Sequence, residues 1–312
     1  MSASMSKKHD ASKSAGTGHR FGGTWTQAKL EILQRYLAAY TLALKDKGFH
    51  LVYIDAFAGT GGVDTAAEEE VQPEGLFPTQ DVLERRKFHD GSARIALQLD
   101  RPFDSYWFVE QNRSRHRELQ DTMECEFPNF RERMEFLQGD ANEALPRILE
   151  RHDWRSSRGV VFIDPYGANV DFETLRAISR VPALDVWLLF PLGQAINRLL
   201  MKDPRNIPAA WTSRLDRVFG TKDWRTTFYK KHTQPMLFGM EEIENKVCDW
   251  DTITEFYKKQ LEDVFAKVAR DAKMLRNSSN IPLFAFIFAM SNPSPKAQGL
   301  ALRIANYILK SD

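Results

Sequence analysis

Four acidic residues follow predicted buried strands, where side chains can gather at one edge of a sheet. Asp55 ends the apolar run 51–54, and Glu110, Asp140 and Asp164 each end or follow a later run. Because the carboxyl ends of parallel strands lie along one edge, we expect these carboxylates around a common cleft. Carboxylates placed there accept hydrogen bonds from hydroxyl and amino groups of a ligand.

The turn after Asp55 reads F-A-G-T-G-G and predicts a nucleotide-binding loop. Gly59 and Gly61 let the backbone approach a ligand closely. A dinucleotide fingerprint needs a third glycine where this chain has Asp64, and no G-K-[ST] follows for a phosphate-binding loop. The turn therefore favours S-adenosylmethionine (SAM), with its methionine part beside the glycines. NAD stays an alternative only if Asp64 is compatible with a pyrophosphate.

The later strand ends predict the remaining SAM contacts. Glu110 follows the second strand, where a carboxylate accepts hydrogen bonds from both ribose hydroxyls of a bound nucleoside. Asp140 is placed to reach the adenine amino group, with the backbone of Ala141 nearby. We expect no metal ion in this site.

The tetrapeptide Asp164-Pro165-Tyr166-Gly167 predicts the reaction. An acidic or amide residue, a proline and an aromatic residue after the fourth strand are typical of methyltransferases that act on amino groups. The Asp164 carboxylate and the Pro165 carbonyl are suited to accept both hydrogens of an –NH2 group, and Tyr166 to stack on a planar base. The common base-methylating motif has a second proline, and strand-end carboxylates often cap the next helix. A capping role for Asp164 therefore stays an alternative.

The N-terminal helix carries Trp25 and Lys29 on one face. One interpretation is that this helix closes over the cofactor and that Lys29 meets a carboxylate or phosphate. The other is a tryptophan in the core and a solvated lysine.

Composition sets the class of protein. The 312 residues carry a formal net charge of +1 at pH 7, so no overall field commits the chain to nucleic acid or membrane. Two cysteines, Cys125 and Cys248, are too few for a disulfide framework or a cysteine zinc site. No run of about 18 apolar residues is present, so we expect neither a membrane span nor a signal peptide. We expect a cytoplasmic protein without membrane association.

Alternating strands and helices predict an α/β fold, a doubly wound Rossmann-like sheet. The predicted strands are 51–55, 106–109, 133–138, 159–163, 184–190 and 281–290, with 273–276 paired to the last as a hairpin. Helices over 25–44 and 297–310 begin and end this series. The predicted domain division is a disordered tail (1–20), a SAM-binding core with its N-terminal helix (21–193) and a surface excursion (63–91), a helical insertion (194–270), and a terminal hairpin and helix (271–312).

Several segments together resemble the three-Cys-motif partner protein (TcmP) family. They are WTQAKLEILQRYL, YIDAFAGTGG, WFVEQN, QGDANEAL, VVFIDPYG and LFAFIFAMSNPSPKA, spread over 25–307. The family is similar in fold to class I SAM methyltransferases and is encoded beside a protein with a three-cysteine motif like that of radical-SAM enzymes. The resemblance implies such a partner, and ligand positions at Asp55, Phe57, Gly59, Gly61, Glu110, Asp140 and Asp164.

We therefore predict SAM-dependent methyl transfer to a nitrogen acceptor, with a nucleic-acid base as the expected substrate. The alternative is a SAM- or nucleotide-binding accessory subunit of a three-cysteine-motif, radical-SAM-like partner, without methyl-transfer activity of its own.

Overall fold

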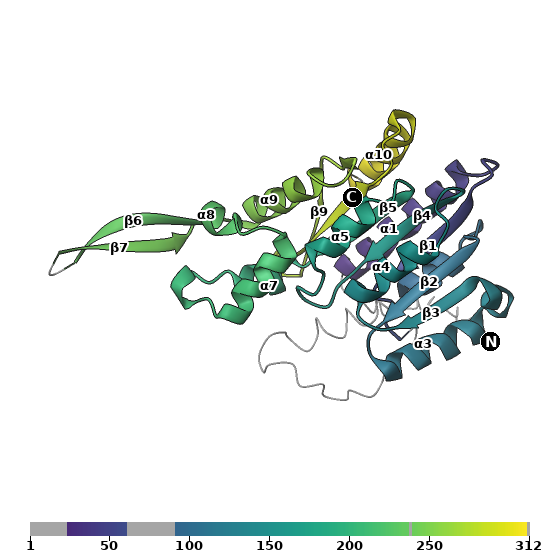
Figure 1. Ribbon diagram of the computed structural model, residues 1–312, viewed down its shortest axis with the longest axis horizontal. Coiled ribbons are helices and arrows are strands. Elements are labelled where there is room, and N and C mark those ends of the chain that lie inside the picture. Colours follow the sequence, from purple (N-terminus) through teal and green to yellow (C-terminus); the bar gives the residue numbers. More distant parts are fainter. Residues whose placement is uncertain (1–23, 61–90, 237–238, 311–312) are drawn as a thin grey trace, which may run out of the picture.

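A central sheet organises the protein in the computed structural model, which describes residues 24–60, 91–236 and 239–310 (Figure 1). The sheet has eight strands, in the order β3-β2-β1-β4-β5-β10-β8, and β9 pairs with β10 off this path. The bounds are β1 (His50–Asp55), β2 (Ser105–Glu110), β3 (Met134–Gln138), β4 (Ser157–Ile163), β5 (Leu184–Phe190), β8 (Lys267–Val268), β9 (Lys273–Arg276) and β10 (Pro282–Met290).

The first five strands are parallel, and the last large strand reverses direction. β1 pairs in parallel with β2 and β4, β2 with β3, and β4 with β5. β10 runs antiparallel to β5, β8 and β9. The carboxyl ends of β1 to β5 therefore share one edge, which is where ligands bind in open α/β sheets. The predicted α/β doubly wound fold and the terminal hairpin are confirmed.

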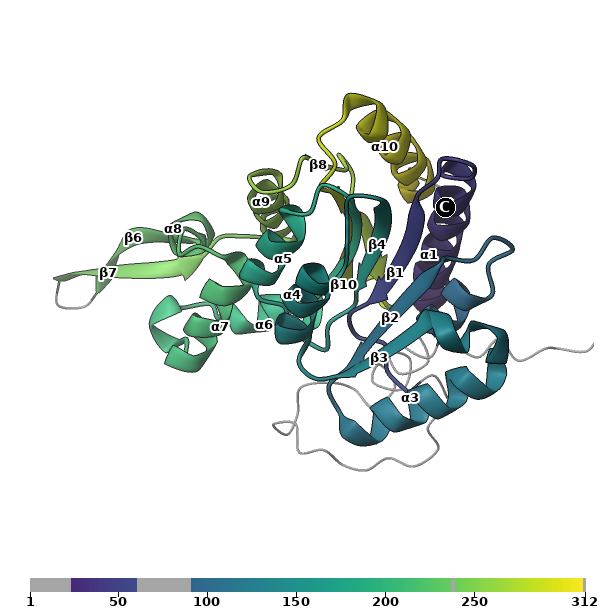
Figure 2. The ribbon, with the colours of Figure 1, turned by 45° about the vertical axis from the view of Figure 1, so that its right-hand side comes forward.

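Helices cover both faces of the sheet, as Figure 2 shows. One hydrophobic core lies under α1 (Thr24–Ala43), α3 (Arg113–Glu126), α10 (Pro295–Lys310) and the helical residues 91–97. The other lies under α4 (Ala141–Arg151), α5 (Phe172–Ser179), α7 (Ala209–Phe219) and α9 (Trp250–Glu262). Because both faces are buried, β4 and β5 consist mainly of apolar residues in continuous runs. Short helical segments complete the chain: η1 (Pro128–Arg133), η2 (Leu192–Ile196), α6 (Asn197–Leu199), η3 (Pro204–Asn206) and α8 (Trp224–Phe228).

The segment 194–270 is not wholly helical, and the prediction of a helical insertion is wrong in this respect. It contains β6 (Tyr229–Met236) and β7 (Gly239–Lys246), an antiparallel hairpin that projects from the body (Figure 1). The run K-K-H-T-Q in β6 has no apolar alternation, and its residues 230–233 are exposed, whereas Tyr229 at the base of the ribbon packs against the core. The tail 1–20 and residues 63–90 of the predicted excursion lie outside the described residues. The domain boundaries stay a prediction.

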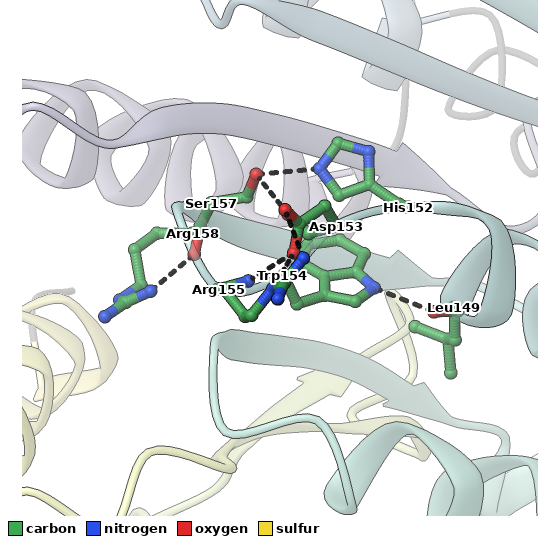
Figure 3. Close-up of polar contacts among 7 residues, drawn as sticks. All are labelled: Leu149, His152, Asp153, Trp154, Arg155, Ser157 and Arg158. Carbon is green, nitrogen blue, oxygen red and sulfur yellow. Dashed lines mark hydrogen bonds and ion pairs between the residues drawn. The ribbon is translucent and has the colours of Figure 1, made fainter.

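The turn between α4 and β4 lies at the amino ends of the strands (Figure 3). The His152 Nε2 atom lies 2.8 Å from the Ser157 hydroxyl, which in turn donates to the Asp153 carbonyl at 2.9 Å. The Trp154 indole donates to the Leu149 carbonyl at 3.0 Å. The Ser157 hydroxyl is buried and already donates to the backbone, so this Ser–His contact fixes the start of β4 and does not form a nucleophile.

Candidate functional site

Three buried carboxylates end neighbouring strands at the carboxyl edge of the sheet. Asp55 ends β1, Glu110 ends β2 and Asp164 directly follows β4, with exposed fractions of 0, 4 and 3 %. β1 lies between β2 and β4, with Asp55 opposite Phe108 on one side and Phe162 on the other. Charged side chains are almost never fully buried unless paired, so each needs a specific partner.

Asp55 is held by several donors. The Phe57 backbone N–H donates to Oδ1 at 3.2 Å, and the Tyr53 hydroxyl donates to Oδ2 at 3.4 Å. The Ser92 hydroxyl is a further partner. Burial raises the pKa of Asp55 to about 7, and the nearby charge of Asp164 also raises it, whereas these hydrogen bonds lower it. Asp55 therefore changes charge near neutral pH.

The glycine turn continues the backbone hydrogen bonding of the sheet before it leaves the edge. The Ala56 N–H donates to the Phe162 carbonyl at 3.0 Å, and the Ala58 N–H to the Val109 carbonyl at 2.9 Å. Gly59 then adopts a φ of 70°, which disfavours a side chain. Gly61, the other predicted loop glycine, lies outside the described residues.

Glu110 is tied to the start of α3. Its Oε1 accepts hydrogen bonds from the Asn112 N–H at 2.7 Å and from Arg115 Nε at 3.3 Å. Burial raises the pKa of Glu110, and Arg115, with the backbone N–H groups of Asn112 and Gly59, opposes this rise. The Arg115 guanidinium also lies 5.4 Å from the centre of the Tyr166 ring. Arg115, for which the sequence predicts no role in the site, thus connects the predicted ribose-binding carboxylate to the predicted base-stacking ring.

Asp140 caps a helix, which is the role that the sequence left open for Asp164. It is the N-cap of α4, and its Oδ1 accepts a hydrogen bond from the Asn142 N–H at 2.7 Å. Ala141 is the first residue of this helix and is buried. The contacts of Asp140 and Ala141 with adenine stay a prediction.

Asp164 does not cap the helix that follows it. That helix, α5, begins at Phe172 with Asp171 at the N-cap, so the alternative based on capping is wrong. Oδ2 of Asp164 lies instead 3.5 Å from the Lys29 ammonium. Pro165 is buried, and Gly167 has a φ of 65°, which allows the tight turn after the tetrapeptide.

Lys29 reaches this edge from α1 and is 0 % exposed. The interpretation of Lys29 as a solvated lysine is wrong, whereas a contact with a carboxylate is confirmed. Trp25 lies in the core, as its alternative interpretation held. A periodic apolar face predicts α1 from sequence, but the meeting of Lys29 with a residue 135 positions away cannot be read from that pattern.

Asn142 joins the loop after Asp164 to α4. Its side-chain N–H donates to the Asn169 carbonyl at 2.8 Å, and its Oδ1 accepts from the Asp171 N–H at 2.9 Å and the Thr174 hydroxyl at 2.8 Å. A small, partly open hollow lies behind this loop, lined by residues that include Pro165. Apolar side chains of β5, α7 and α9, among them Phe190, Val218 and Tyr257, form its other walls.

The part of the chain that the structure describes has neither a candidate metal cluster nor a helix fit to span a membrane. No group of three or more histidine, cysteine, aspartate or glutamate side chains among the described residues is arranged to hold a metal ion. None of the helices in the described ranges is long and apolar enough to cross a membrane.

Comparisons with known proteins found no matching family model and no matching curated protein. The chain is similar to the solved structure of protein LPL1258 from Legionella pneumophila (15 % identity, 91 % of this chain, 92 % of that one, TM-score 0.47). It is also similar to a putative SAM-dependent methyltransferase from Listeria monocytogenes (8 % identity, 82 % of this chain, 97 % of that one, TM-score 0.35). A third similar structure is an O-methyltransferase from Bacillus cereus in complex with S-adenosylhomocysteine (12 % identity, 69 % of this chain, 80 % of that one, TM-score 0.32).

These similarities are low, so the fold is assigned from the sheet itself. The order 3-2-1-4-5 is shared with dinucleotide-binding folds, but the antiparallel β10 beside β5 is not part of their all-parallel sheet. The fold is a doubly wound, Rossmann-like α/β sheet with one antiparallel strand, the arrangement expected from the sequence. The resemblance to the TcmP family has no support among the comparisons and stays a prediction.

Proposed function

We propose that the protein transfers the methyl group of SAM to a nitrogen acceptor, with a nucleic-acid base as the substrate class. The observation that carries this proposal is the buried Asp164 of the D-P-Y-G tetrapeptide, which ends the strand next to the glycine turn of β1. It caps no helix, so a structural explanation by capping does not apply.

The residues at this edge fit SAM in chemical type. Glu110 is a buried carboxylate at the end of β2, suited to ribose hydroxyls, and Gly59 brings bare backbone close to it. Asp55 is a buried carboxylate, and its negative charge would favour a cationic ligand nearby. When bound, SAM supplies an electrophilic methyl group on a sulfonium.

The protein's contribution to such a reaction is alignment. Asp164 and the Pro165 carbonyl would accept the two hydrogens of the acceptor –NH2 and so aim its lone pair at the methyl carbon. The N–C bond forms as the C–S bond breaks, the sulfonium becomes a thioether, and one proton then leaves the methylated nitrogen. The Tyr166 ring, held near Arg115, would stack on the acceptor base.

Calorimetric titration with SAM, S-adenosylhomocysteine and NAD tests the cofactor, and transfer of tritiated methyl to unmodified single-stranded DNA and RNA tests the reaction. We expect SAM to bind and NAD not to bind. Asp164→Ala should keep SAM affinity and lose transfer, whereas Glu110→Ala should lose affinity. Unchanged SAM affinity in both Glu110→Ala and Asp55→Ala would contradict the site.

A second candidate is an accessory subunit of a three-cysteine-motif partner. The hairpin β6–β7 favours it, because it projects from the body and is accessible to a partner from both sides (Figure 1). Co-expression with such a partner distinguishes the two functions. If Asp164→Ala supports the partner's reaction as well as the wild type does, the accessory role is favoured.

A further inference from the structure

Helix α1 places a lysine inside the carboxyl edge of the sheet. Lys29 is 0 % exposed, although lysine is almost never fully buried unless it is paired. Moving an ammonium out of water costs several kcal/mol even after the protein relaxes. The groups around its Nζ must therefore account for its position.

Three elements meet at the Lys29 ammonium. Nζ lies 3.5 Å from Oδ2 of Asp164, just after β4. It also lies 4.3 Å from the ring centre of Trp25 on α1 and 4.9 Å from that of Phe284 on β10. The two rings are 5.5 Å apart and inclined by 29°, and both lie within cation–π distance of the ammonium. The aromatic rings hold the ammonium at the Asp164 carboxylate.

Stability is a weak explanation for this arrangement. Apolar residues of similar volume often replace a buried ion pair without loss of stability. The edge also holds Asp55, whose buried carboxyl interacts unfavourably with the charge of Asp164. Two carboxylates and one ammonium are a costly set to bury, and sequences depart from such local rules chiefly at functional sites.

We propose that Lys29 is the positioning residue for Asp164. This inference rests on the methyl-transfer function proposed above. By attracting Oδ2, the ammonium sets the plane of the carboxylate and so the direction in which it accepts from the acceptor amino group, beside the Pro165 carbonyl. Its charge also offsets the repulsion between the Asp55 and Asp164 carboxylates.

A positioning role for Lys29 predicts a specific change in the pH dependence of methyl transfer. Within the described ranges, the titratable groups that face Asp164 are Lys29 from α1 and Asp55 from β1, and Tyr53 contacts Asp55 in turn. Without the ammonium, the Asp164 charge acts on Asp55 unopposed, which raises the pKa of Asp55 further. Loss of Lys29 should therefore move the pH of half-maximal transfer upward.

The test compares Lys29→Met with Lys29→Arg in the full-length protein. Methionine keeps the apolar stem beside Trp25 and Phe284 but removes the charge, and arginine keeps the charge. The measurements are SAM affinity by calorimetry, and kcat and KM between pH 6 and 9 for tritiated methyl transfer to the oligonucleotide that the wild type methylates. We expect Lys29→Met to lower kcat about 100-fold, as misplacement of a reacting group does, with SAM affinity kept. Lys29→Arg should restore most of the rate.

Two controls separate positioning from folding. Tyr36→Phe alters the same helix away from this edge and should leave kcat unchanged. In a protein that already carries Asp164→Asn, Lys29→Met should lower kcat only slightly, because Lys29 acts through Asp164. The same loss in both backgrounds would overturn the inference, as would wild-type kcat and pH profile in Lys29→Met. A wild-type protein that methylates no oligonucleotide would instead overturn the proposed function.

Discussion

Asp185 and Tyr36 form a buried pair at the sheet edge opposite the candidate site. Asp185 is the second residue of β5 and is 6 % exposed, and the Tyr36 hydroxyl on α1 donates to its Oδ2 at 2.6 Å. Burial raises the pKa of Asp185 from 3.8 to about 7, and the hydrogen bond from Tyr36 opposes this rise. The folded protein therefore keeps the proton up to about pH 7, whereas the unfolded chain loses it near pH 3.8.

The sign of the effect on stability follows from this difference. The contribution of Asp185 to stability is fully present below pH 3.8 and is lost as the pH rises through about 7. Each pH unit between these two pKa values removes about 1.4 kcal/mol, so the full loss approaches about 4 kcal/mol. Asp185→Asn removes the titration and keeps an acceptor for Tyr36. The free energy of unfolding of the variant, relative to that of the wild type, should therefore increase by roughly 2 to 3 kcal/mol when the pH is raised from 5 to 8.

Urea unfolding of both proteins at pH 5 and pH 8 measures this gain. The other buried carboxyl with a similarly raised pKa, Asp55, is present in both proteins and cancels in the comparison. Tyr36→Phe removes the donor and should destabilise the protein more at pH 8 than at pH 5. If the difference in the free energy of unfolding between Asp185→Asn and the wild type stays constant or shrinks as the pH rises, the reasoning is refuted. It would mean that Asp185 is already ionised in the folded protein at pH 5.

Three further predictions concern the site and its support. SAM carries a sulfonium that ionised Asp55 attracts, so calorimetry should show SAM affinity rising about tenfold from pH 6 to pH 8. The affinity for S-adenosylhomocysteine, which lacks the sulfonium charge, should change less with pH. An equal pH dependence for the two ligands would contradict the placement of Asp55 near the sulfonium. Asn142→Ala removes three side-chain hydrogen bonds and should cost about 2 kcal/mol in urea unfolding and slow methyl transfer. Gly220→Ala should cost at least about 2 kcal/mol, because φ is 67° and the new Cβ meets the Phe172 ring at 2.5 Å; an unchanged midpoint would be inconsistent with this packing.

The central strands could be predicted closely because helices bury both of their faces. β5 has the predicted bounds, since the run 184–190 is almost wholly apolar and every residue in it is buried. The hairpin β6–β7 could not be predicted in this way. Its strands pair only with each other, and contacts such as Lys231 with Glu242 at 3.2 Å replace apolar alternation. Hydrophobic periodicity arises from burial against a core, so it gives no signal over the exposed residues 230–233 of β6.

In the candidate site, too, local features could be predicted from the sequence, whereas contacts between distant segments could not. Carboxylates at strand ends are local features, and Asp55, Glu110 and Asp164 could be placed at one edge from strand order alone. Their partners depend on how helices dock. Arg115 reaches Glu110 because Asn112 begins α3 at that point, and Lys29 reaches Asp164 because α1 packs across the sheet. Side-chain contacts of this kind follow from tertiary packing, which a single sequence does not display.

The charge at the carboxyl edge favours a cationic ligand over a neutral one. Of the described residues, Lys29, Asp164 and Asp55 together are neutral when Asp55 is protonated and carry one negative charge when it is ionised. The pKa of Asp55, raised to about 7, lies where a small change in local potential decides between these states. A ligand with a positive charge stabilises the ionised state and is itself stabilised by it, whereas an anionic pyrophosphate meets the opposite response. The same burial that makes this carboxyl costly to ionise would thus favour SAM, the proposed cofactor, over a dinucleotide.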